Sequence, residues 1–127
     1  MSEHRATVEW QRAGEFRYET YSRGHTIDFE GIAVPGTAAP ANIPKTSNTR
    51  PGVDPEQAFV ASLSSCHMLW ALHLCAEAGV VAVGYEDRAS AAMRENADGS
   101  GEFVEAVLRP RLTLAAGDPE ALESIHR

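Results

Sequence analysis

The sequence has few basic residues for its length, and this shortage argues against two classes of partner. In 127 residues, 11 Lys and Arg stand against 18 Asp and Glu, which gives a formal net charge of −7. An acidic surface repels phosphate backbones and anionic lipid headgroups, so we expect no nucleic-acid partner and no membrane partner. The first ten residues, MSEHRATVEW, also lack the basic and apolar segments of a secretory signal. We therefore expect a cytoplasmic protein.

Cysteine is scarce too, since the chain contains only Cys66 and Cys75. In a reducing compartment, such residues are packing residues or chemical thiols more often than they are partners in a disulfide. On one helix the two would lie about 13 Å apart and on opposite faces. A disulfide needs Cα atoms within roughly 7 Å, so these two cannot pair within the helix. We expect Cys75 to be a small buried apolar residue.

Charged residues are absent from positions 58 to 76, a length close to that of a membrane span. The stretch nevertheless contains polar side chains: Ser62, Ser64, Ser65, His67 and His73. Because polar and ionisable residues are costly inside a bilayer, a helix buried in protein is favoured over a membrane span.

The same stretch begins and ends with clear helix signals. Asp54 suits the N-cap, Pro55 the first helical position, and Gln57 completes a capping box. Gly79 suits the C-cap, which predicts a helix of about 24 residues and roughly 36 Å. Because this helix is apolar on nearly all sides, we expect it to lie between a sheet and a second copy of itself, as in a homodimer.

Before this helix, partial alternation of apolar and polar residues predicts strands within residues 5–12 and 16–31, forming a hairpin or meander. Residues 32–52 contain four prolines and two glycines. This composition predicts an ordered extended loop, with a flexible linker as the alternative, and excludes helix or central strand.

After the long helix, residues 80–93 and 102–117 read as two strands joined by a hairpin at Asp98-Gly99. Asp118 opens a second helix of about two turns, which is marginal alone. Either this helix packs firmly or, as we favour, it continues beyond Arg127. At 127 residues, the chain has room for one domain. We expect a single α+β domain over residues 1–127.

At 100° per residue, Cys66 shares one helix face with an apolar stripe: Phe59, Ser62, Leu63, Leu69, Trp70 and His73. One interpretation makes Cys66 a packing residue. The other makes it a reactive thiol, which has to be a thiolate near a cation. A mid-helix position supplies no help from the helix dipole. An arginine from elsewhere in the chain is the natural source of charge.

Neither histidine near Cys66 suits direct catalysis or metal binding. His67 points about 100° away from the thiol, as a packing or interface residue would. His73 is on the correct face but about 10 Å distant. Pairs among Cys66, His67, His73 and Cys75 lack the i, i+3 or i, i+4 spacing of shared ligands, so we expect no metal site.

The stretch VDPEQAFVASLSSCHMLW, with an acidic residue ten positions before a helical cysteine, resembles the OsmC/Ohr family. This family comprises osmotically inducible protein C and organic hydroperoxide resistance proteins. YEDRASAAM and VLRPRLTL resemble the strands that follow the helix in OsmC-like sequences. SRGHTIDFEG and VPGTAAP are similar to one subgroup. The resemblance extends over residues 8 to 127.

The resemblance implies an intertwined α+β homodimer with antiparallel sheets around long central helices and active sites at the subunit interface. It implies thiol-dependent reduction of organic hydroperoxides in oxidative stress, with an external dithiol reductant and no cofactor. Cys66 matches the cysteine that attacks the peroxide, and Glu56 matches the acidic residue of the motif. Arg23 is the best match for the active-site arginine, and Arg17 is the alternative.

These roles are chemically compatible. Arg23 would hold Cys66 as thiolate, while Glu56 would orient the guanidinium through a two-pronged contact. The apolar residues Phe59, Leu69 and Trp70 would receive the alkyl part of the peroxide. Glu56 and Cys66 are about 15 Å apart along one helix. We therefore favour the hypothesis that Glu56 serves the Cys66 of the other subunit, with action within one chain as the alternative.

One feature departs from the family pattern. The family usually carries a second, resolving cysteine in a stretch like H-x-x-C, and this sequence ends at His126-Arg127. Either a tail with that cysteine follows Arg127, which we favour, or this is a one-cysteine variant that uses an external thiol. Two other functions remain open: a module of the same fold that binds a small molecule without turnover, and a structural protein in which Cys66 only packs.

Overall fold

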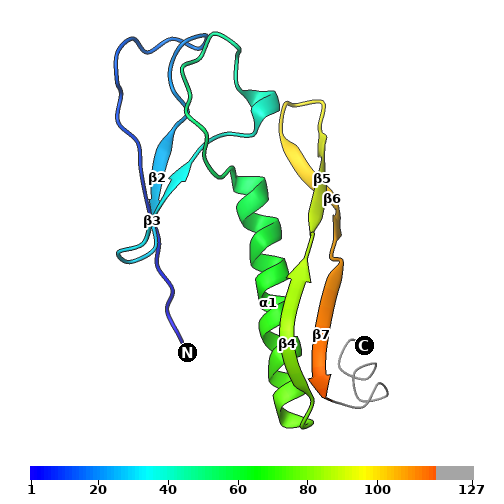
Figure 1. The fold of residues 1–127 in the computed structure, drawn as a ribbon. Helices are drawn as coiled ribbons and strands as arrows, with labels where there is room; N and C mark the ends of the chain where they lie inside the picture. The colour runs from blue at the N-terminus through cyan, green and yellow to red at the C-terminus, as the bar shows by residue number, and fades with distance from the viewer. Residues whose placement is uncertain (117–127) are drawn as a thin grey trace. The chain divides into compact units, whose positions relative to one another are not determined.

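The computed structural model describes residues 1–116. The chain divides into two compact units, Met1–Ala58 and Phe59–Arg127, which are described separately. Figure 1 shows short strands joined by long loops in the first unit and, in the second, most of the long helix α1 (Pro55–Glu77) beside strand β4 (Val81–Asp87). The helix predicted from Asp118 lies outside the described residues. The expected single domain stays a prediction, but the mixture of antiparallel strands and one long helix confirms the α+β class.

The first unit contains a three-stranded antiparallel meander in the order β1-β2-β3. The strands are β1 (Thr7–Glu9), β2 (His25–Asp28) and β3 (Ala33–Gly36). The meander was predicted, but the strand expected from residue 16 begins only at His25. Before it the chain makes a turn, in which the N–H groups of Thr20 and Tyr21 both donate to the Arg17 carbonyl, at 3.1 and 2.9 Å.

Strand β3 corrects the prediction that residues 32–52 form only an extended loop. Pro35 is accommodated because β3 is an edge strand of its sheet. The Pro35 carbonyl points outward and accepts the Val53 N–H at 2.8 Å. The ring nitrogen of the same residue faces the same way, so the ladder with β2 loses no donor. The rest of the segment is irregular except for the short 3₁₀ helix η1 (Pro40–Asn42).

Helix α1 (Pro55–Glu77) has the predicted ends. Asp54 and Gln57 form the reciprocal capping box, with Gln57 N–H to Asp54 Oδ1 at 2.8 Å and Asp54 N–H to Gln57 Oε1 at 3.1 Å. At the other end, Gly79 has φ of +72°, and the Val80 N–H bonds back to the Cys75 carbonyl at 2.9 Å. This is a Schellman C-cap, which needs a residue that tolerates positive φ.

The second unit contains two antiparallel strand pairs, β4 with β7 and β5 with β6. Their bounds are β4 (Val81–Asp87), β5 (Ser90–Glu95), β6 (Gly101–Val107) and β7 (Pro110–Ala116). The predicted hairpin is confirmed, since β5 and β6 are joined around Gly99, whose φ is +88°.

Each of the two strands predicted in this unit is interrupted, at residues 88–89 and 108–109. At the break, side chains replace the backbone ladder. Asp87 Oδ1 accepts the Arg109 N–H at 2.6 Å. The Arg109 guanidinium donates to the Arg88 carbonyl at 2.9 Å and to Ser90 Oγ at 3.0 Å. These bonds satisfy polar groups that a continuous ladder would otherwise pair.

The buried core of the single chain is small. Among the described residues, only Ala71, Cys75 and Val80 are buried apolar residues, which confirms the expected burial of Cys75. Large apolar side chains of α1 remain exposed by 39 to 62%: Phe59, Leu63, Leu69 and Trp70. Length and hydropathy alone would also allow α1 to cross a membrane, a test that core helices pass as well. Residues 1–116 therefore do not supply the burial expected for this helix.

Candidate active site

Cys66 lies in the middle of α1, and its thiol is exposed in the single chain. The predicted apolar neighbours share this part of the helix. Phe59 stacks on Phe103 of β6 with ring centroids 4.4 Å apart, whereas Leu69 and Trp70 are 61 and 62% exposed. The thiol is thus accessible to a reactant and is flanked by apolar surface.

His73 is engaged by its own helix. Its Nε2 lies 3.1 Å from Glu77 Oε1, and its ring stacks on Trp70 at 5.2 Å between centroids. These contacts agree with the expectation that His73 is not the base that activates Cys66.

Arg23 is held rigidly within the first unit. Its Nη1 donates to the Tyr21 carbonyl at 2.7 Å, and its Nη2 donates to the Tyr18 carbonyl at 2.9 Å. The guanidinium carbon lies 3.6 Å from the centroid of the Tyr21 ring and 5.3 Å from that of Tyr18. A backbone bond from Arg23 N–H to Thr49 Oγ1, at 3.0 Å, fixes the same residue from the other side. The result is a positive charge of fixed position among aromatic rings.

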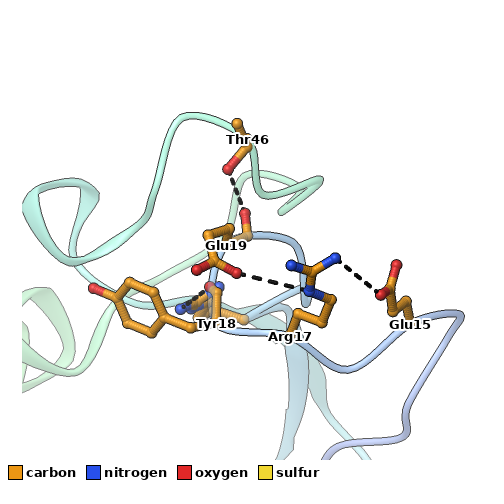
Figure 2. Close-up of polar contacts among 6 residues, drawn as sticks. Glu15, Arg17, Tyr18, Glu19 and Thr46 are labelled. Carbon is orange, nitrogen blue, oxygen red and sulfur yellow. Dashed lines mark hydrogen bonds and ion pairs between the residues drawn. The ribbon is translucent and has the colours of Figure 1, made fainter.

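Arg17, the alternative arginine, is in a different setting. Figure 2 shows its guanidinium between Glu15 and Glu19, with nitrogen–oxygen distances of 3.4 and 4.0 Å. In the same view Thr46 bonds to the Glu19 carbonyl. Arg17 is 63% exposed, so its charge is solvated and already balanced by two local carboxylates. This difference favours Arg23 as the arginine available to a site.

Glu56 lies in the first turn of α1, and its carboxylate is incompletely satisfied. Its Oε2 is buried and has no hydrogen-bond partner within residues 1–116. Arg23 bonds to backbone carbonyls instead, so the single chain does not join the two side chains that were expected to form a two-pronged contact. A buried carboxylate oxygen without a donor is costly. Glu56 therefore has an unused capacity to accept a hydrogen bond.

A polar network between α1 and β4 was not found from the sequence. Ser64 Oγ donates to Asp87 Oδ2 at 2.6 Å, beside a cavity of about 400 Å³ that Ser64, Tyr85 and Asp87 help to line. The Ser64 hydrogen bond is the main cause that lowers the pKa of Asp87, and the Arg109 N–H and the charges of His67 and Arg109 act in the same direction. Burial and the nearby negative charge of Asp87 both raise the pKa of Tyr85, and burial has the larger effect.

The lowered pKa of Asp87 predicts a pH-dependent stability. A carboxylate with a depressed folded-state pKa stabilises the fold above its ordinary pKa of about 4 and ceases to do so as the pH falls through the folded-state value. We expect Asp87→Asn to lower the urea midpoint at pH 6 and to have a smaller effect at pH 3. Ser64→Ala, which removes the main cause, should reduce this difference. Equal effects of Asp87→Asn at both pH values would contradict the assignment.

The sequence predicted no metal site, because the Cys and His residues of the long helix lack the spacing of shared ligands. Within the described part of the chain, no group of three or more His, Cys, Asp or Glu side chains is arranged to hold a metal ion.

No protein-family profile matches the chain, and no curated protein matches it. Solved structures, in contrast, do match the chain. An OsmC-like protein of unknown function from Vibrio cholerae O1 biovar eltor is 35% identical, with a TM-score of 0.84 over 99% of this chain and 86% of the other. The chain therefore belongs to the OsmC/Ohr family.

Two more distant structures share the fold of this OsmC-like chain. An OsmC-like protein from Mycoplasma pneumoniae is 13% identical, with a TM-score of 0.69 over 98% of this chain and 80% of that one. The organic hydroperoxide resistance protein OhrB of Bacillus subtilis is 16% identical, with a TM-score of 0.51 over 96% and 80% of the two chains. The predicted family is thus confirmed. The roles of Cys66, Arg23 and Glu56 in this OsmC-like protein stay predictions.

Proposed function

We propose that this chain is a cysteine-based peroxidase that reduces organic hydroperoxides to alcohols. The observation that supports the proposal most directly is the accessible Cys66 thiol within apolar helix surface. A fold shared with an organic hydroperoxide resistance protein is consistent with it. An apolar setting suits an organic hydroperoxide better than it suits hydrogen peroxide.

The proposed reaction has two stages. The Cys66 thiolate attacks the terminal oxygen of the hydroperoxide, so that an S–O bond forms and the O–O bond breaks. The alkoxide leaves with a proton as the alcohol, and Cys66 is left as a sulfenic acid. One thiol of an external dithiol then displaces water to form a mixed disulfide. Its second thiol releases Cys66 and leaves the reductant as a disulfide. No cofactor takes part.

In this mechanism Arg23 is the cation that stabilises the thiolate. Its permanent charge suits it to this role, and its bonds to the Tyr18 and Tyr21 carbonyls fix its position in the first unit. Glu56 is the carboxylate that orients a donor, either within one chain or across the dimer. The unsatisfied Oε2 of Glu56 supports this assignment, because that atom requires a donor which residues 1–116 do not provide.

The test of the proposed function is an assay of the reduced protein with cumene hydroperoxide and dithiothreitol. The expected result is consumption of the peroxide, formation of cumyl alcohol in equal amount, and a sulfenic acid on Cys66 when the dithiol is omitted. A protein that consumes no peroxide and forms no sulfenic acid would refute the proposal. Such a protein would be a binding or structural member of the family. We further propose that the protein is cytoplasmic.

We also propose that the protein works as a homodimer. Helix α1 is apolar on nearly all sides, so we expect its side chains to be buried. Several remain exposed, among them Phe59, Leu69 and Trp70. A second copy would cover them. The same stripe would then form the apolar surroundings of Cys66.

The dimer has a direct test in Trp70→Glu. A buried unpaired charge in the interface is costly, so we expect this variant to sediment as a monomer of 13.7 kDa, while the wild type sediments at twice that mass. Arg5→Glu changes charge at a residue that is 68% exposed on the first unit and should leave the dimer intact. A wild-type monomer, or a dimer unaffected by Trp70→Glu, would contradict the proposed interface.

A further inference from the structure

The two faces of the three-stranded meander differ in chemistry. Successive side chains of a strand point to opposite faces, and Glu9 pairs with Thr26 as Thr26 pairs with Pro35, so these three residues share one face. The other face carries apolar residues of the same strands: Val8, Ile27 and Val34. The face of Glu9, with the loops beside it, lines a cavity of about 630 Å³ that lies wholly within the first unit. We refer to it as the Glu9 cavity, and its volume is in the range of small-molecule sites.

The loop after η1 forms one wall of the Glu9 cavity, and alternate residues of this loop are anchored away from the cavity. Ser47 Oγ donates to the Tyr21 carbonyl at 2.8 Å and lies 2.6 Å from Thr49 Oγ1. Asn48 and Arg50, which alternate with these two residues, line the cavity instead. Because the anchored residues hold the backbone of the loop, a ligand would lose little entropy in ordering this wall.

Two opposite charges line the Glu9 cavity without pairing. Glu9 lies on β1 and Arg50 on the loop wall, and both side chains are exposed to solvent. Within residues 1–116, neither side chain forms a hydrogen bond or an ion pair. A guanidinium binds a carboxylate through two parallel N–H bonds, and a carboxylate accepts the N–H donors of an ammonium group. The cavity therefore offers one accessible charge for each end of a dipolar molecule.

Trp10 supplies an aromatic wall of the same cavity. Its indole N–H donates to the Ser22 carbonyl at 2.9 Å. Its ring meets Phe16 and Tyr21 edge-on, with centroids 5.7 and 6.2 Å apart. These contacts hold the ring, which nevertheless stays 42% exposed. An aromatic surface that is already held in place suits an aromatic group of a ligand.

We propose that the Glu9 cavity binds a zwitterionic α-amino acid with an aromatic side chain. Arg50 holds its carboxylate, Glu9 holds its ammonium group, and Trp10 contacts its ring. A ligand with only one charge would leave the opposite charge of the cavity without a partner, so the charges favour a dipolar ligand over either singly charged analogue. Neither Cys66 nor a peroxide takes part, so this inference does not rest on the proposed peroxidase.

The test compares three compounds of similar size: L-phenylalanine, 3-phenylpropionate, which lacks the ammonium group, and phenethylamine, which lacks the carboxylate. Each is titrated into the reduced full-length protein at low salt while the backbone amide resonances are followed by NMR. We expect L-phenylalanine to shift the resonances of Thr26 and Asn48. It should bind about two- to fivefold more tightly than either analogue, the range for exposed ion pairs.

Charge variants assign each preference to one side chain. Arg50→Gln should abolish the preference over phenethylamine, and Glu9→Gln should abolish the preference over 3-phenylpropionate. Each variant should keep the other preference, which also establishes that it is folded. Lys45→Gln and Glu95→Gln remove the same charges from exposed residues that do not line the cavity. Both control variants should retain both preferences.

Three results would overturn the inference. They are equal affinity for the three compounds, preferences that survive in both Arg50→Gln and Glu9→Gln, and shifts confined to Val8 and Val34 on the other face of the meander. The proposed function fails separately. If L-phenylalanine binds with both preferences but no cumene hydroperoxide is consumed, the amino-acid site stands and the peroxidase falls. If peroxide is consumed but the preferences are absent, only the amino-acid site falls.

Discussion

Replacing Cys66 by serine is expected to abolish hydroperoxide reduction, lowering kcat/KM by at least about a thousandfold. A serine hydroxyl is not ionised near neutral pH and cannot form a sulfenic acid, so the first stage of the reaction has no substitute nucleophile. The measurement is dithiothreitol-dependent consumption of cumene hydroperoxide. The exposed position of Cys66 makes the substitution mild for the fold, so a loss of activity can be read as a loss of chemistry.

The matched control is Cys75→Ala. Cys75 is 1% exposed and on the opposite face of α1 by helical geometry. Its replacement should lower the melting temperature through a small cavity while leaving kcat/KM within about twofold. Full activity in Cys66→Ser protein, or loss of activity only in the Cys75 variant, would show that the reactive thiol has been misassigned.

Arg23→Ala is expected to lower kcat/KM by about 100-fold, equivalent to about 2.7 kcal/mol of transition-state stabilisation. The physical reason is the loss of a fixed cation that favours the thiolate and the developing negative charge on the leaving oxygen. Arg17→Ala removes an equal charge from an exposed residue already balanced by Glu15 and Glu19. That control should remain within about twofold of the wild type.

The Arg23 guanidinium also stacks on the Tyr21 ring and bonds to the Tyr18 carbonyl. The Arg23→Ala variant therefore needs a test of folding beside the activity assay. Circular dichroism would test whether Arg23→Ala protein is folded. Arg23→Lys keeps the charge while losing the planar fork that bridges the Tyr18 and Tyr21 carbonyls. We expect the Lys variant to recover part of the lost activity. If Arg17→Ala lowers kcat/KM more than Arg23→Ala does, Arg17 is the active-site arginine and Arg23 is not.

Features set by neighbouring residues could be predicted from the sequence. Both ends of α1 follow from short local patterns, because the Asp54–Gln57 box and the Gly79 cap act within one turn of the helix. The same is true of the hairpin around Gly99. The position of Cys66 on an apolar face also follows from helical periodicity alone.

Features set by distant pairs could not be predicted in this way. The interruption of the second unit's strands depends on Asp87 and Arg109, which lie far apart in sequence and meet only after the strands pair. No periodic pattern of apolar residues in the sequence predicts such a contact. Likewise β3 contains a proline that composition assigns to a loop, and only its place at a sheet edge makes it a strand.

The candidate site shows the same division. The resemblance to the family could nominate Arg23 and Glu56, but it could not show that Arg23 is bonded to backbone carbonyls or that Glu56 leaves one oxygen unsatisfied. The ring contacts among Trp10, Phe16 and Tyr21 had one signal in the sequence. Five of the nine aromatic residues fall within the first 29 positions: Trp10, Phe16, Tyr18, Tyr21 and Phe29.

The central claim is that Arg23 keeps Cys66 as a thiolate near neutral pH, and the rate of Cys66 alkylation by iodoacetamide at pH 6 tests it most directly. An ordinary thiol is barely ionised at this pH, and a Cys75→Ala background removes the other thiol from the measurement. The account predicts that Cys66 reacts at least about tenfold faster in this background than in the same protein with Arg23→Ala, and that Arg17→Ala leaves the rate unchanged. Equal, slow rates with and without Arg23 would contradict it.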